Sequence, residues 1–146
     1  MKAKVNEISI KYQGGFKIAD APKINSSEDA TKVFYKSWNK GKIGLQECFK
    51  IMLLNNANRV KGIYEVSSGG ITGTMVDLRI VFAVVLKSLT TAVILAHNHP
   101  SGTLKPSEAD KSLTEKIIKA ALLFDIKVLD HLIITPDGNF FSFADE

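Results

Sequence analysis

The chain has 146 residues, of which 45% are hydrophobic and 23% are charged, proportions typical of a soluble globular protein with a single core. No run approaches the roughly 20 apolar residues of a membrane-spanning helix, and we expect no signal peptide because the N-terminus lacks an apolar stretch. Cys48 is the single cysteine, which excludes an intramolecular disulfide and a cysteine-based zinc cluster and leads us to expect a reducing, cytoplasmic compartment.

The basic charge balance bears on nucleic-acid binding. The net charge is +4 and the isoelectric point is about 9.1. All but two of the 19 basic residues are lysines, and only Arg59 and Arg79 offer the forked donor that reads guanine. We therefore expect any nucleic-acid binding to be weak, non-specific and sensitive to salt.

The first part of the chain predicts a helix and a β-hairpin. Residues 1–23 alternate loosely between polar and apolar, which indicates one or two short strands or an extended arm. A helix is predicted at about 27–39, with Trp38 packed in the core. The run Cys48–Leu54 reads as a buried strand, and after a turn Val60–Ser67 returns as its hairpin partner.

Two further helices are indicated by apolar residues at helical spacing. Asp77 caps the first, and its inward face is predicted to hold Leu78, Val81, Phe82, Val85, Leu86 and Leu89. The second is predicted from about Glu108 to Phe124, with Ala109, Leu113, Ile117, Ala120 and Phe124 pointing inward.

Three more strands complete the pattern, over residues 90–96, 127–135 and 140–143. The resulting order β-β-α-β-α-β-β predicts an α/β fold in which helices flank one mixed β-sheet. Open α/β sheets bind ligands at the carboxyl ends of their strands, so we expect the active site at the end of the strand that finishes at Ala96.

Polar residues follow that strand directly. His97 and His99 are two positions apart, so on a continuing strand they project to the same side. Ser107 follows a proline and opens a helical pattern, which is an N-cap position, and Asp110 falls in the first helical turn. Two imidazoles and a carboxylate can converge there as three protein ligands of an open zinc site.

Other interpretations exist for each residue alone. A Ser-x-x-Asp pair at a helix start is a variant of the capping box, and a lone histidine at a strand end is usually structural. Capping and ligation can coexist, because Ser107 can cap the helix while Asp110 turns to a metal. The full string of His-x-His-Pro followed by Ser-x-x-Asp favours the metal site.

That full string resembles the signature of the JAMM (MPN-type) zinc metalloproteases. The wider sequence HNHPSG with KPSEAD, and Leu129-Asp130-His131 downstream, resembles the RadC-like branch, often labelled DNA repair proteins. The resemblance runs from about Ile43 to the C-terminus. It implies a cytidine-deaminase-like JAB/MPN fold over residues 43–146, with residues 1–42 as an N-terminal extension packed on it.

The resemblance also implies a set of roles. The MPN pattern places a glutamate general base on a strand upstream of the histidines, and we assign it to Glu65 in the second hairpin strand. The alternative is that Glu65 points to solvent from an edge strand. Ser107 is expected to stabilise the oxyanion or to hold the metal-bound water, and Zn²⁺ is expected on His97, His99 and Asp110. Four further residues are candidates for supporting the site: Asn98, Ser101, Asp130 and His131.

We therefore expect a zinc metallohydrolase, a metallopeptidase or isopeptidase of the JAMM type, acting on a peptide or isopeptide substrate that the sequence does not identify. One alternative is a DNA-repair-associated protein acting as an adaptor or nuclease. It has only the basic isoelectric point in its favour, and we find no helix-hairpin-helix motif. Another is a non-catalytic scaffold domain, which we rank last because every position of the signature is present.

Overall fold

A five-stranded sheet forms the centre of the molecule in the computed structural model, which describes residues 4–69 and 75–146. Its strand order is β2-β1-β3-β4-β5. The strands are β1 (Cys48–Leu54), β2 (Val60–Ser68), β3 (Ala92–Asn98), β4 (Lys127–Ile134) and β5 (Phe140–Ser142). The pair β3 and β4 is parallel and the other neighbours are antiparallel, which confirms the predicted mixed sheet.

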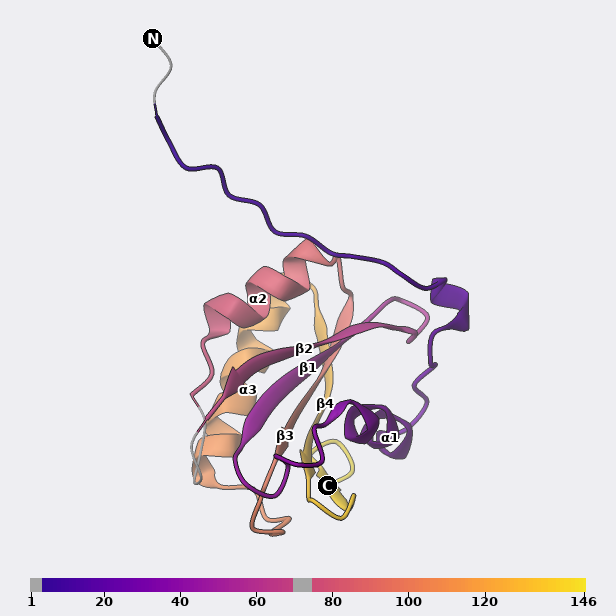
Figure 1. Ribbon diagram of the computed structural model, residues 1–146, viewed down its shortest axis with the longest axis vertical. Coiled ribbons are helices and arrows are strands. Elements are labelled where there is room, and N and C mark those ends of the chain that lie inside the picture. The colour runs from indigo at the N-terminus through magenta and orange to yellow at the C-terminus, as the bar shows by residue number, and fades with distance from the viewer. Residues whose placement is uncertain (1–3, 70–74) are drawn as a thin grey trace.

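Helices cover both faces of this sheet. In Figure 1, α1 (Ser27–Ser37) lies on one side, and α2 (Leu78–Lys87) and α3 (Glu108–Leu122) lie on the other. Two apolar clusters fill the space between the layers, one on the α1 face and one on the α2–α3 face. This arrangement confirms the predicted α/β fold. None of the helices in the described part of the chain is long and apolar enough to cross a membrane.

The central strand β3 is buried along its whole length because it has a strand on each side and helices on both faces. Its residues alternate between the two clusters. Ile94 and Ala96 pack on the α1 face, whereas Val93 and Leu95 pack on the α2–α3 face. His97 is the next residue in this alternation, so its side chain belongs to the α2–α3 face.

The helices differ from the predicted ones at their ends and at four apolar positions. The helix predicted over 27–39 ends at Ser37, and Trp38 is its C-cap and is buried as expected. The prediction of an inward side chain is wrong for Leu86, Leu89, Ala109 and Phe124, which are exposed. The reason is geometric, because only a narrow stripe of each helix reaches the sheet, led by Val81 and Val85 in α2 and by Thr114, Ile117 and Ala121 in α3.

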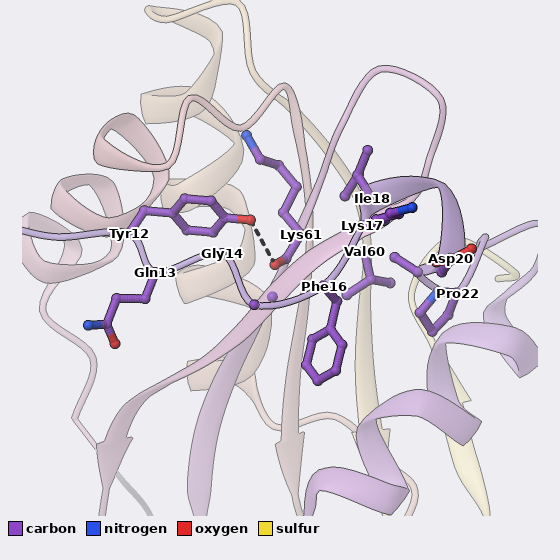
Figure 2. A pocket seen from close by; sticks show the side chains of 13 residues that line it. Tyr12, Gln13, Gly14, Phe16, Lys17, Ile18, Asp20, Pro22, Val60 and Lys61 are labelled. Carbon is purple, nitrogen blue, oxygen red and sulfur yellow. Dashed lines mark hydrogen bonds between the residues drawn. The ribbon is translucent and has the colours of Figure 1, made fainter.

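The N-terminal segment is an extended arm. It contains one 3-10 turn, Ile18–Asp20, and its first described residues lead away from the sheet (Figure 1). The Tyr12 hydroxyl donates to the Lys61 carbonyl over 3.4 Å, as Figure 2 shows. Between the arm and β2 lies an open hollow of about 1100 Å³ whose lining contains no histidine or cysteine. Its polar lining consists of Tyr12, Gln13, Lys17, Asp20 and Lys61.

Candidate metal centre

Three side chains meet where β3 ends and α3 begins. His97 Nε2 lies 3.0 Å from His99 Nε2 and 3.2 Å from Asp110 Oδ1. His99 Nε2 lies 3.4 Å from Asp110 Oδ2. We call these three residues the His-His-Asp group. Their ligand atoms lie close enough together to hold one metal ion, as the strand alternation and the helix start predict.

The start of α3 places the carboxylate of this group. The Ser107 hydroxyl oxygen accepts a hydrogen bond from the Asp110 backbone N–H over 3.0 Å, and Asp110 Oδ2 accepts from the Ser107 N–H over 2.8 Å. This reciprocal pair is a capping box. The capping interpretation of Ser-x-x-Asp is therefore confirmed, and capping leaves the same carboxylate facing the histidines.

The donor set of the group calls for a cation. His99 Nδ1 lies 2.7 Å from the Thr103 carbonyl oxygen, which can only accept, so Nδ1 carries the hydrogen. In neutral His99 the other nitrogen, Nε2, is then a bare acceptor that faces the acceptor oxygens of Asp110. Facing acceptors repel each other unless a proton or a metal ion lies between them. Two imidazole nitrogens and a carboxylate oxygen are ligands that suit zinc.

Charge coupling inside the group shifts the pKa of its members. Burial alone would raise the pKa of Asp110, but hydrogen bonds from His97 and His99 outweigh it and hold this pKa well below its usual range. The hydrogen bond to Asp110 raises the pKa of His99 above 6.5, although burial opposes the shift. A proton on His99 therefore competes with a metal for the same position.

This competition predicts opposite pH trends for the two forms of the protein. Since the folded pKa of His99 lies above 6.5, its charge stabilises the metal-free fold below pH 6.5, and this contribution is lost as the pH rises through the folded pKa. A metal ion held at His99 Nε2 would have to displace that proton, so metal affinity is expected to rise with pH up to the folded pKa of His99. We expect the gap in melting temperature between the metal-loaded and metal-free forms to widen as the pH rises toward the folded pKa of His99 and to level off above it. A gap that stays constant with pH would contradict the competition.

Glu65, the predicted general base, does not reach the His-His-Asp group. In the sheet Glu65 pairs with Lys50, whereas His97 pairs with Phe49. Neighbours along β1 point to opposite faces, so Glu65 shares the α1 face with Lys50 while His97 lies on the other face. Glu65 is also exposed on the edge strand β2, as the alternative interpretation of the sequence has it.

Glu47 is the acid that the structure brings to the group instead. It directly precedes β1 and is two residues from Phe49, which pairs with His97, so the start of β1 lies beside the end of β3. Burial raises the pKa of Glu47, whereas the charges of His97 and His99 lower it. Glu47 is not among the predicted site residues, because the family pattern was matched to the second hairpin strand. In the sequence Glu47 is an acidic residue directly before an apolar strand, and only the pairing of Phe49 with His97 places it beside the group.

Asn98 secures the segment that carries Glu47. Its side chain is fully buried, and its Oδ1 accepts a hydrogen bond from the Cys48 N–H over 2.7 Å. Its Nδ2 donates to the carbonyls of Ile43 and Gln46 over 2.8 and 2.9 Å. One asparagine on the α1 face of β3 thus satisfies three backbone groups around the start of β1.

Replacing Asn98 with alanine is expected to destabilise the fold by about 2–4 kcal/mol, because three buried backbone groups lose their partner. The free energy of unfolding from chemical denaturation measures this. Asn139→Ala is a matched control, because the Asn139 side chain is exposed and its amide donates to the exposed Asp137 carboxylate rather than to buried backbone. Equal stability losses in the two variants would contradict the anchoring role of Asn98.

The other supporting candidates fall into different places. The His131 side chain contacts His97, with Nε2 2.8 Å from His97 Nδ1, and burial lowers the pKa of His131 well below 6.5. Asp130 faces the other way and accepts from the Ser142 hydroxyl over 2.6 Å, and burial raises its pKa. Ser101 is exposed and accepts from the Thr103 N–H over 3.3 Å. Of these three, only His131 touches the His-His-Asp group.

Comparison with known proteins agrees with this geometry. A UPF0758 protein of Flavobacterium johnsoniae is 47% identical over 124 residues, covering 85% of this chain and 52% of that protein. A UPF0758 protein of Porphyromonas gingivalis is 46% identical over 101 residues, covering 69% of this chain and 44% of that protein. The chain thus spans about half the length of these curated relatives. The RadC-like JAB domain profile matches residues 24–146, a range that contains α1 and the His-His-Asp group, and the chain belongs to this family.

Proposed function

We propose that the chain is a zinc-dependent hydrolase of amide bonds, a metallopeptidase or isopeptidase of the JAMM type, with His97, His99 and Asp110 as the metal ligands. The observation that carries this proposal is the convergence of three acceptor groups within 3.4 Å at a strand end, beside a half-buried carboxylate. Membership in the RadC-like JAB family supports it.

The chemistry divides between the metal and the residues of the chain. When bound, zinc supplies Lewis acidity that polarises a carbonyl and makes water nucleophilic near neutral pH. Glu47 takes over the general-base role first assigned to Glu65, receiving the proton of the attacking water and delivering it to the leaving amine. Burial raises the pKa of Glu47, which moves this carboxylate toward the range a general base needs.

Ser107 retains its proposed role in stabilising the oxyanion. Its hydroxyl oxygen is already an acceptor for the Asp110 N–H, so the hydroxyl hydrogen is directed elsewhere. Ser107 is exposed at the start of α3, beside the ligand Asp110. From there its O–H can donate to a substrate oxygen that gains negative charge.

An amide substrate is favoured over a phosphodiester by the number of metal positions. Phosphodiester cleavage commonly uses two metal ions about 4 Å apart, which need a second set of ligands. Within residues 4–69 and 75–146, the His-His-Asp group is the one cluster of histidine, cysteine or acidic residues with metal-binding geometry. A single ion with an adjacent glutamate suits acyl transfer.

The test combines metal analysis with an activity screen. Protein purified without added zinc is analysed for bound metal and then screened against a peptide library and isopeptide-linked peptides, with labelled single- and double-stranded DNA alongside. We expect about one zinc per chain, and amide cleavage that a chelator removes and added zinc restores. Absence of bound zinc, or cleavage of DNA rather than peptides, would overturn the proposal.

A further inference from the structure

A buried chain of hydrogen bonds runs behind His97. His97 Nδ1 lies 2.8 Å from His131 Nε2, and His131 Nδ1 lies 2.5 Å from the Thr114 hydroxyl oxygen. The Thr114 hydroxyl in turn donates to the Asp110 backbone carbonyl over 2.7 Å. His97, His131 and Thr114 are 2%, 1% and 7% exposed, so water has little access to compete. These hydrogen bonds join His97 to the backbone of Asp110, so they connect two members of the His-His-Asp group.

The Asp110 backbone carbonyl oxygen, at the end of this series of hydrogen bonds, sets the direction of every hydrogen in the series. A carbonyl oxygen only accepts, so Thr114 gives its single hydroxyl hydrogen to Asp110. The Thr114 oxygen must then accept the hydrogen on His131 Nδ1. A neutral His131 with its hydrogen on Nδ1 has a bare Nε2, which accepts from His97 Nδ1–H.

The surroundings of His131 favour this neutral form. The ring of Phe143 stacks on the His131 imidazole with centroids 4.8 Å apart, and the Phe49 ring makes a T-shaped contact with it at a centroid distance of 5.6 Å. His131 is 1% exposed, so a positive charge on its ring would be cut off from water and therefore costly. A doubly protonated His131 would instead donate from Nε2 to His97 Nδ1. The hydrogen of His97 would then lie on Nε2, the nitrogen that faces His99 and Asp110.

We propose that His131 and Thr114 are positioning residues that hold His97 in the tautomer whose Nε2 accepts, and so present that nitrogen to the metal. This inference rests on the proposed zinc function. We call the hydrogen bonds from His97 through His131 to Thr114 the relay. His99 needs no relay, since the Thr103 carbonyl sets its tautomer directly. The two histidines of the group thus reach the same tautomer by different means, one through a backbone carbonyl and one through two side chains.

The test uses a matched pair of substitutions at Thr114. Thr114→Val removes the hydroxyl with little change in shape, whereas Thr114→Ser keeps the hydroxyl and serves as the control. Zinc affinity is measured for both by competition with a chromogenic chelator. We expect Thr114→Val to weaken zinc binding by about 10- to 100-fold, as loss of such outer partners typically does, while Thr114→Ser stays close to the unmodified protein. Equal zinc affinity in the two variants would overturn the relay.

A second measurement reads the tautomers directly and needs no variant. Nitrogen-15 NMR of the imidazoles distinguishes hydrogen on Nδ1 from hydrogen on Nε2, and the chain has only three histidines to assign. In metal-free protein at a pH well above the usual imidazole pKa, we expect His97 and His131 to carry hydrogen on Nδ1. Hydrogen on Nε2 of either would overturn the relay even where zinc binds, whereas the expected tautomers without zinc binding would count against the proposed function alone.

Discussion

If the chain binds zinc as proposed, a His97→Ala, His99→Ala double variant is expected to fall from about one zinc ion per chain to close to none. The expectation follows from the ligand count, because only the carboxylate of Asp110 then remains of three protein ligands. Metal analysis after extensive dialysis measures the loss. The sheet is expected to form without the metal, since two apolar clusters pack both of its faces, so circular dichroism should remain that of a folded protein.

A matched pair of acidic residues controls for surface charge. Asp110→Asn removes the ligand carboxylate, whereas Glu108→Gln removes an equal charge from the same helical turn. The Glu108 side chain is 93% exposed and bonds to Lys111 rather than to the histidines. We expect zinc loss in the first variant and retention in the second. Stoichiometric zinc in the double histidine variant would contradict the ligand assignment.

The position of the His-His-Asp group could be predicted from local rules. Strand alternation places His97 and His99 on one side, and the helix start at Ser107 places Asp110 in the first turn. Each rule acts over a few residues, and the full string joins them. The strand order was not needed, because the same stretch of chain carries all three side chains.

The general base could not be predicted in the same way, because its position depends on which strands are neighbours. Glu47 and Glu65 both precede the histidines in the sequence, Glu47 directly before β1 and Glu65 within β2. Only the antiparallel pairing of β1 with β3, in the register that pairs Phe49 with His97, distinguishes them. Local periodicity contains no information on strand order, so hairpin membership was a misleading guide.

The helix faces were predicted only in part for a related reason. A short helix rich in apolar residues, such as α2, offers several stripes at helical spacing, and the neighbour decides which one is buried. In α3 the buried residues include Thr114, a polar side chain that an apolar pattern passes over. That residue is buried because its hydroxyl bonds to His131 and to the Asp110 carbonyl. The polar contacts of the candidate site thus decide part of the helix orientation.

Glutamine substitutions at Glu47 and Glu65 separate the two candidates for the general base. If the chain hydrolyses amides as proposed, Glu47→Gln should keep its zinc and lose about 10²- to 10⁴-fold in rate, because the amide cannot accept the proton of the water. Glu65→Gln should keep both zinc and rate, since Glu65 lies on the opposite face of the sheet. Single-turnover rates on a substrate from the peptide screen, with metal analysis of each variant, measure the difference. Loss of zinc in Glu47→Gln would make Glu47 a ligand, and loss of rate in Glu65→Gln alone would return the base to the position that the sequence first indicated.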